Sequence, residues 1–282
     1  MSKAAVQPFF DEITKTVTFI VVDQASRQAA IIDPVLNLDP GTRALSTFQA
    51  DKLIDYLDQN NLQLEWLLET HLHTDHISAS HYLRERRGGQ IGISEQVTRA
   101  QHSFQRHFNL DTALPCDGRG FDYFFKDGEV IFLGHLELEV MATPGHAPDC
   151  VSYKIEDMLF VGPAILMPDC GTARTDLPGS SSKAMYQSIQ KILSLPDHTR
   201  IFVGLDHKSQ ARECFACETS VFEERRDNVH LREAANESEF IRLKKQIKND
   251  CSARRLWRSV IPLNMRAGQI PEKNSKGICF KA

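Results

Sequence analysis

The stretch Thr-His-Leu-His-Thr-Asp-His at residues 70–76 constrains this chain more than any other feature of its sequence. It follows an apolar run, residues 64–69, that is typical of a buried strand. Side chains two residues apart on an extended backbone point to the same side, so His71 and His73 are expected to converge. Asp75 and His76 follow on the turn toward the next helix. Three imidazoles and a carboxylate at a strand end predict a metal site.

A fourth histidine, His146, ends the sequence Thr-Pro-Gly-His at residues 143–146. It follows an apolar strand, and the Pro-Gly pair forces a turn that presents the imidazole at the strand end. With His71 and His73 it completes a set of three histidines, which together with a water is a known catalytic zinc arrangement. A metal held in this way lowers the pKa of the water towards neutrality. We therefore expect one divalent metal ion, zinc or iron.

Composition and charge exclude several classes of protein. The 282 residues are 41% hydrophobic and 25% charged, as in an ordinary globular protein, and the net charge of −4 gives no basic footprint for nucleic acid. No apolar run approaches the length of a membrane span, and residues 1–10 lack the pattern of a secretory signal. We expect neither nucleic acid nor a membrane as a partner, and a cytoplasmic location.

Seven cysteines at irregular spacing favour free thiols in a reducing compartment. Cys214 and Cys217 form a C-x-x-C pair, which we expect on one face of a helix rather than in a redox or zinc site.

The order of predicted elements indicates the fold class. Strands are predicted over residues 16–23, 28–33, 64–69, 90–93 and 199–203 and within the β-rich segment 122–161, and helices over residues 48–59, 76–87, 94–108 and 182–193. This mixture predicts an α/β (α+β) protein with two sheets covered by helices, a four-layer αββα sandwich. Charged surface helices are predicted within residues 212–228 and 237–248. The tail, residues 258–282, carries Pro262, Pro271 and Gly277 and is predicted to be irregular.

Taken in order, residues 70–76, 143–146 and 170–176 resemble the metallo-β-lactamase superfamily. The resemblance covers roughly residues 8–232 and includes Asp33 at the end of an apolar strand. Within the superfamily the chain is most similar to the persulfide dioxygenase and glyoxalase II branch, and above all to bacterial β-lactamase-like hydrolases associated with sulfide detoxification. The segments that carry this closer similarity are residues 167–176, 228–230 and 264–268. The resemblance implies an αββα domain over residues 1–232, with the metal at the outer edge of its sheets, and a helical or irregular extension over residues 233–282 packed on it.

The resemblance also implies roles for individual residues. The metal ligands would be His71, His73, Asp75, His76 and His146, with Asp75 also catalytic, and Arg174 would lie near the carboxylates of a thiol substrate. Two positions depart from the family pattern. Pro163 stands where the family has an Asp, which bridges two metals in the hydrolases and is the sole carboxylate ligand of iron in the dioxygenases. Leu205 stands where the family has a His, so the second metal site is expected to be lost.

These departures leave three functions open. The first is a mononuclear hydrolase that attacks a thioester. The second is a persulfide dioxygenase-like enzyme in which Asp75 or Asp169 replaces the missing carboxylate. The third is a catalytically impaired homologue that acts as a binding or regulatory protein. His207, two residues after Leu205, could face the same way on a strand, and its use as a substitute ligand is left open. The expected substrate is a small-molecule thiol, persulfide or thioester of sulfur or glutathione metabolism, and a homodimer is left open.

Overall fold

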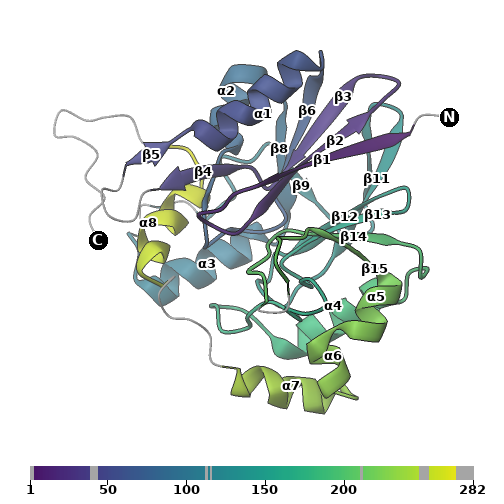
Figure 1. Ribbon diagram of the computed structural model, residues 1–282. Helices are drawn as coiled ribbons and strands as arrows, with labels where there is room; N and C mark the ends of the chain where they lie inside the picture. Colours follow the sequence, from purple (N-terminus) through teal and green to yellow (C-terminus); the bar gives the residue numbers. More distant parts are fainter. Residues whose placement is uncertain are drawn as a thin grey trace.

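Two six-stranded sheets face each other, each covered by helices on its outer side (Figure 1). The computed structural model describes residues 3–38, 44–111, 114, 116–209, 212–247 and 254–270. The first sheet has the order β1 (Ala4–Phe10), β2 (Val17–Asp23), β3 (Gln28–Ile32), β6 (Gln63–Leu68), β8 (Gln90–Ser94), β9 (Tyr123–Phe125). The second has the order β10 (Val130–Leu133), β11 (Leu136–Ala142), β12 (Val151–Ile155), β13 (Met158–Gly162), β14 (Arg200–Val203), β15 (Glu218–Ser220).

The helices divide between the two sheets. The first sheet is covered by α1 (Phe48–Gln59), α2 (Ser80–Arg87), α3 (Val97–Phe108) and α8 (Arg254–Asn264). The second is covered by α4 (Ser182–Leu193), α5 (Val221–Asp227), α6 (Val229–Glu233) and α7 (Glu237–Gln246). A small sheet of β5 (Leu45–Ser46), β4 (Val35–Leu38) and β7 (Ile77–Ser78) lies beside them.

Alternating side chains produce the layers. On β2, Ile20 and Val22 pack under the helices of the first sheet, whereas Phe19 and Val21 point between the two sheets. Successive side chains on a strand face opposite sides, so a strand apolar on both faces serves two cores at once. The four-layer αββα sandwich predicted from the sequence is confirmed.

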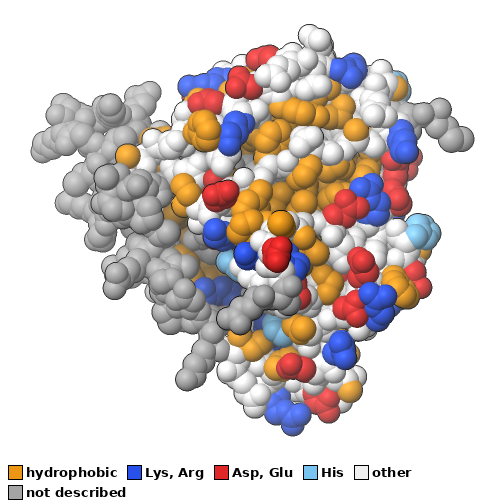
Figure 2. All heavy atoms as spheres, in the orientation of Figure 1, with side chains coloured by type: hydrophobic (Ala, Val, Ile, Leu, Met, Phe, Trp, Pro, Cys, Tyr) orange, Lys and Arg blue, Asp and Glu red, His pale blue; other side chains and the backbone are white. Residues whose placement is uncertain are grey.

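Several predicted elements differ from those observed. The helix predicted from residue 76 begins only at Ser80, because Ile77 and Ser78 pair with β4. Strand β1 was not predicted, since it lacks alternation and contains Pro8. It forms an edge strand of partly exposed residues, and hydrophobic side chains gather across the face over which it runs (Figure 2).

The predicted helix around Cys214 and Cys217 is wrong. The segment runs along β14, where Val203 N donates to the Cys217 carbonyl and Ala216 N donates to Asp206. Cys116, Cys150, Cys170, Cys214 and Cys217 are free thiols, and Cys251 and Cys279 lie outside the described residues.

The tail is helical where it was predicted to be irregular. Helix α8 forms despite Pro262, because Trp257, Val260 and Ile261 are spaced to bury one face in the first core. Residues 271–282 lie outside the described part of the chain. None of the described helices combines the length and apolar character needed to span a bilayer.

Candidate metal centre

Four buried histidines meet at the end of β6. Residues 69–76, here called the histidine loop, connect β6 to β7. The ring centroids of His71 and His73 lie 4.2 Å apart, those of His73 and His76 4.2 Å, and those of His71 and His146 5.1 Å. All four side chains are buried. The structure therefore brings together the imidazoles that the sequence placed in one site, although His146 is distant in the chain.

Two of these imidazoles have their tautomer set by hydrogen bonds. His146 Nδ1 lies 3.0 Å from the carbonyl oxygen of Arg174, which can only accept, so Nδ1 carries the proton. The Thr70 hydroxyl donates to Asp33, and so it accepts from His71 Nδ1 at 3.0 Å. Both rings therefore keep an unprotonated Nε2. Burial lowers the pKa of His146 to about 4, and burial together with His73 lowers the pKa of His71 well below its ordinary value. Neutral imidazole is the form that binds metal ions.

His73 lies between two carboxylates and the centre of the site. Its Nε2 is 3.0 Å from Asp33 Oδ1 and 2.9 Å from Glu69 Oε2. Burial opposes protonation, but Asp33 and Glu69 outweigh it and raise the pKa of His73 well above its usual value. Nδ1 is buried without a hydrogen bond and lies 3.8 Å from Asp75 Oδ1. Carboxylates behind one ring nitrogen orient a histidine whose other nitrogen binds a metal.

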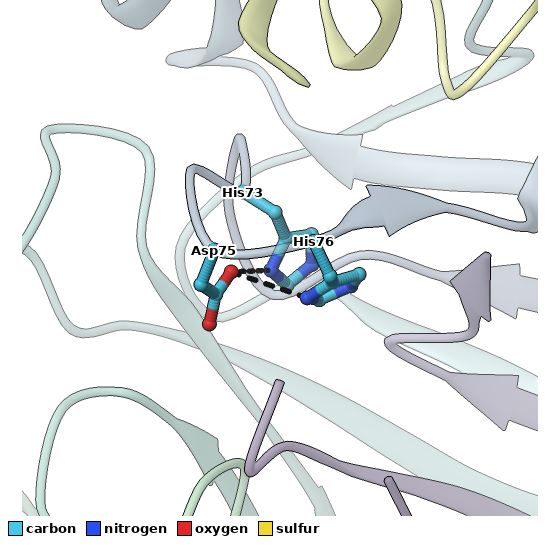
Figure 3. A group of neighbouring side chains, drawn as sticks. All are labelled: His73, Asp75 and His76. Atoms are coloured by element: carbon cyan, nitrogen blue, oxygen red, sulfur yellow. Dashed lines mark hydrogen bonds and ion pairs between the residues drawn. The ribbon is translucent and has the colours of Figure 1, made fainter. Parts of the chain in front are cut away.

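Asp75 faces the imidazoles of His73 and His76 (Figure 3). Its Oδ1 is 3.1 Å from His76 Nδ1, and His76 Nε2 is buried without a partner. Burial would raise the pKa of Asp75, but His76 and His73 hold it well below its usual range, so the group is an ionised carboxylate. One ligand atom from each of these three residues lies within 4.8 Å of the others.

This donor set fits a divalent metal ion. His73 Nδ1 and His76 Nε2 are buried side-chain atoms with no hydrogen-bond partner, and the ionised Asp75 lies 3.8 Å from the first and 3.1 Å from the other ring nitrogen of His76. Buried polar atoms are rarely left unpaired, and each such atom indicates a missing partner. Imidazole nitrogen with a carboxylate oxygen is a donor combination that suits zinc and iron.

Buried side chains hold the backbone of the histidine loop. Asp33 accepts from Thr70 N at 2.7 Å, Asp149 Oδ2 accepts from Leu72 N at 2.7 Å, and Asn264 donates to the carbonyls of His73 and His76. Of these side chains, Asp33 is predictable from the sequence, whereas Glu69, Asp149 and Asn264 carry no predicted role. For Glu69 the sequence shows an acidic residue four positions before His73, but it does not show that the two side chains meet. Asn264 lies in residues 264–268, a segment that carries the family resemblance, but the resemblance implies no role for it.

The two positions that depart from the family pattern lie at one edge of the second sheet. Pro163 follows Gly162 at the end of β13, and Leu205 follows Gly204 just after β14. Gly204 N donates to the Gly162 carbonyl at 3.0 Å, so these strand ends are in contact. A Cβ on Gly162 would lie 2.5 Å from Thr70 Oγ1, which places this edge beside the start of the histidine loop.

The sequence also offers Asp169 and His207 as substitute ligands. Asp169 accepts from Arg212 Nε at 2.6 Å and from the Ser209 hydroxyl. His207 is exposed.

Arg174 contacts the site through its backbone. Its carbonyl accepts from His146, whereas its guanidinium pairs with Asp176, with Nη2 2.7 Å from Oδ2. The guanidinium also lies over the Trp257 ring, 5.0 Å from the centroid. The side chain predicted to bind substrate is therefore already engaged by a carboxylate of the chain.

Known proteins share both sequence and fold with this chain. Residues 14–204 match the family described as the metallo-beta-lactamase superfamily. Glyoxylase B2 of Dictyostelium discoideum is 38% identical over 281 residues, which cover 99% of this chain and 96% of that protein. The mitochondrial persulfide dioxygenase ETHE1 of Homo sapiens is 31% identical over 201 residues, covering 70% and 66% of the two chains. The crystal structure of ETHE1 from Myxococcus xanthus has a TM-score of 0.75 at 28% identity, covering 94% of this chain and 100% of that one. The resemblance inferred from the sequence is confirmed, and the chain belongs to the metallo-beta-lactamase superfamily.

Proposed function

We propose that this protein is a mononuclear metal-dependent hydrolase that cleaves thioesters of small-molecule thiols. The observation that carries the proposal is His73 Nδ1, a buried imidazole nitrogen without a hydrogen-bond partner, 3.8 Å from the ionised Asp75. Keeping such groups buried without a partner is costly, and a bound cation removes that cost.

The metal would be held by His71, His73 and His146. A divalent ion there would polarise a carbonyl and lower the pKa of water. The hydrogen bonds to Thr70 and to the Arg174 carbonyl leave Nε2 of His71 and of His146 available for it. Asp75 stays ionised, so it suits the orientation of a water or acceptance of its proton rather than donation.

A second metal site is not part of the proposal. Pro163 offers no ligand atom and Leu205 offers only an apolar side chain, and the two positions follow strand ends that touch. Loss of two donors at one edge removes the carboxylate and the imidazole that a second ion would need.

The contacts of the carboxylates considered as iron ligands favour thioester hydrolysis over persulfide oxidation. A mononuclear iron oxygenase uses two histidines and one carboxylate with open positions. Asp169 is paired with Arg212, and this pairing argues against its use as a ligand. Asp75 remains a candidate, because its Oδ1 is 3.8 Å from His73 Nδ1. Persulfide oxidation is therefore the second candidate, supported by the similarity to the human dioxygenase.

For the substrate, we propose that Arg174 binds a carboxylate of the thiol portion, as in a glutathione thioester. A guanidinium can pair with both oxygens of one carboxylate. A cytoplasmic location and action in sulfur or glutathione metabolism complete the proposal.

Metal analysis tests the proposal first. Protein purified without added metal is expected to contain about one equivalent of zinc or iron, and His71→Ala or His146→Ala should lose it. His102→Ala, at an exposed position on α3, is the matched control and should keep it. Release of thiol from a glutathione thioester would support hydrolysis, whereas oxygen uptake with glutathione persulfide would support the second candidate. Absence of metal after reconstitution would overturn both and favour a binding protein.

A further inference from the structure

The C-terminal end of α8 contacts the backbone of the histidine loop through one side chain. Asn264, the last residue of α8, is buried. Its Nδ2 donates to the carbonyl of His73 at 2.9 Å and to that of His76 at 2.7 Å. Its Oδ1 accepts from Ser78 N at 2.9 Å. One amide thus uses both of its donor hydrogens and its oxygen on three backbone groups that flank the site.

The backbone carbonyls of His73 and His76 have few other sources of a hydrogen bond. His73 and His76 lie outside the regular ladders of the sheets, so their carbonyls are not satisfied by strand pairing. Buried carbonyls need a partner, and Asn264 supplies it for both residues. The two residues held in this way are also the two whose imidazoles carry an unpartnered buried nitrogen.

The segment that follows Asn264 is fixed in place. Gln101 Nε2 on α3 donates to the Met265 carbonyl at 2.8 Å, and His81 N donates to the Ala267 carbonyl at 3.1 Å. Gly268 has φ +78°, and a Cβ there would lie 1.9 Å from the Ser78 carbonyl oxygen. Asn264 is therefore presented to the loop from a docked turn, on the α8 side of the first sheet (Figure 1).

We propose that Asn264 is a positioning residue of the metal centre, which sets the direction of the His73 and His76 imidazoles by fixing their backbone carbonyls. The part of this role that concerns metal binding rests on the proposed function. The hydrogen bonds from Asn264 to the histidine loop are present without metal. Asn264 does not touch an imidazole, so its influence passes through the backbone alone.

The test compares Asn264→Leu and Asn264→Asp with a matched variant, Gln101→Met. Leu keeps the approximate shape of Asn and removes its hydrogen bonds. Asp keeps an acceptor for Ser78 N and loses the two donors. Its added negative charge would by itself favour a cation, so weaker metal binding in this variant reports the lost donors. Gln101→Met removes a buried amide that holds the same segment but does not contact the loop.

Co²⁺ binding, followed by its visible spectrum and by competition with a chelator, is the first readout. Both Asn264 variants should bind Co²⁺ about tenfold to a hundredfold more weakly, with an altered spectrum, whereas Gln101→Met should stay within about twofold. Equal affinities and spectra in all folded variants would overturn the proposal. If Asn264→Leu does not fold, the Co²⁺ affinity and spectrum of Asn264→Asp decide the test.

Hydrogen exchange in the metal-free proteins is the second readout. Amides of residues 70–78 should exchange at least about tenfold faster in the Asn264 variants than in wild type or Gln101→Met. Unchanged exchange there would overturn the role of Asn264 whether or not metal binds. Wild-type protein that binds no Co²⁺ would instead overturn the proposed function, and exchange would still decide the role of Asn264.

Discussion

The Nε2 atom of His73 lies 3.0 Å from Oδ1 of Asp33, in a pair that is buried on both sides. The same carboxylate accepts from the backbone N and the hydroxyl of Thr70, each at 2.7 Å. Asp33 thus fixes both where the histidine loop starts and how its second imidazole is oriented.

Replacement of this carboxylate by an amide should weaken the site and the fold. In Asp33→Asn only one oxygen remains for three donors, so at least one buried donor loses its partner, which costs about 1–3 kcal/mol. Zinc affinity should fall by about tenfold to a hundredfold. Urea unfolding and zinc competition measure the two effects. Asp58→Asn, which alters an exposed pair with Arg87, should change neither, and an equal change in both variants would contradict the prediction.

Restoring the two absent donors should restore a second metal. The double variant Pro163→Asp, Leu205→His is expected to raise the metal content from one to two ions per chain, because both positions follow strand ends in mutual contact. Metal analysis after dialysis against zinc measures the change. Each single variant should stay near one ion. A double variant that also stays near one ion would show that these positions do not limit the second site.

Asp176 should compete with an anionic substrate for Arg174. Because the guanidinium is paired with Asp176, Asp176→Asn is expected to lower the KM for a carboxylate-bearing thioester by about fivefold, corresponding to about 1 kcal/mol. Arg174→Gln should raise the KM, with little change in metal content. A neutral thioester provides the control, since its KM should respond to neither substitution. Parallel changes for both substrates would argue against carboxylate binding by Arg174.

Glu224 should make stability depend on pH. This buried side chain accepts from Asn228 with one oxygen and leaves Oε1 unpartnered, and burial raises its pKa to about 8. Between about pH 4.5 and 8 the folded state retains a proton that the unfolded state loses, so wild-type stability falls as pH rises. In Glu224→Gln this loss disappears. Its stability relative to wild type should rise by on the order of a few kcal/mol from pH 5 to pH 8, as measured by urea unfolding. A constant difference across this range would contradict the raised pKa.

Local patterns predicted much of the fold and part of the site. His71 and His73 could be placed together because strand geometry relates residues two apart. Helices α1 and α4 were predicted with the observed bounds, since each carries its apolar residues at helical spacing. Prediction of secondary structure from the sequence was wrong where contacts between distant segments determine the conformation. The Cys214–Cys217 segment is not helical, because Asp206 and Val203 form hydrogen bonds with its backbone.

The rest of the site depends on contacts that leave no local pattern. Glu69 belongs to a predicted strand, and nothing in its neighbours shows that it faces His73 rather than solvent. Asp149 binds the backbone of Leu72, which any residue would offer. Asn264 lies 188 residues beyond His76, and hydrogen bonds to carbonyls do not depend on the identity of the residue contacted.

The dependence of the histidine loop on Asn264 has a consequence for synthesis of the protein. The ribosome makes His76 188 residues before Asn264, which at ordinary elongation rates is on the order of 10–40 s. During that interval the nascent chain carries its imidazoles without the hydrogen bonds that α8 later provides. On the proposed role of Asn264, a metal ion captured before α8 arrives would be held by a loop that lacks these hydrogen bonds.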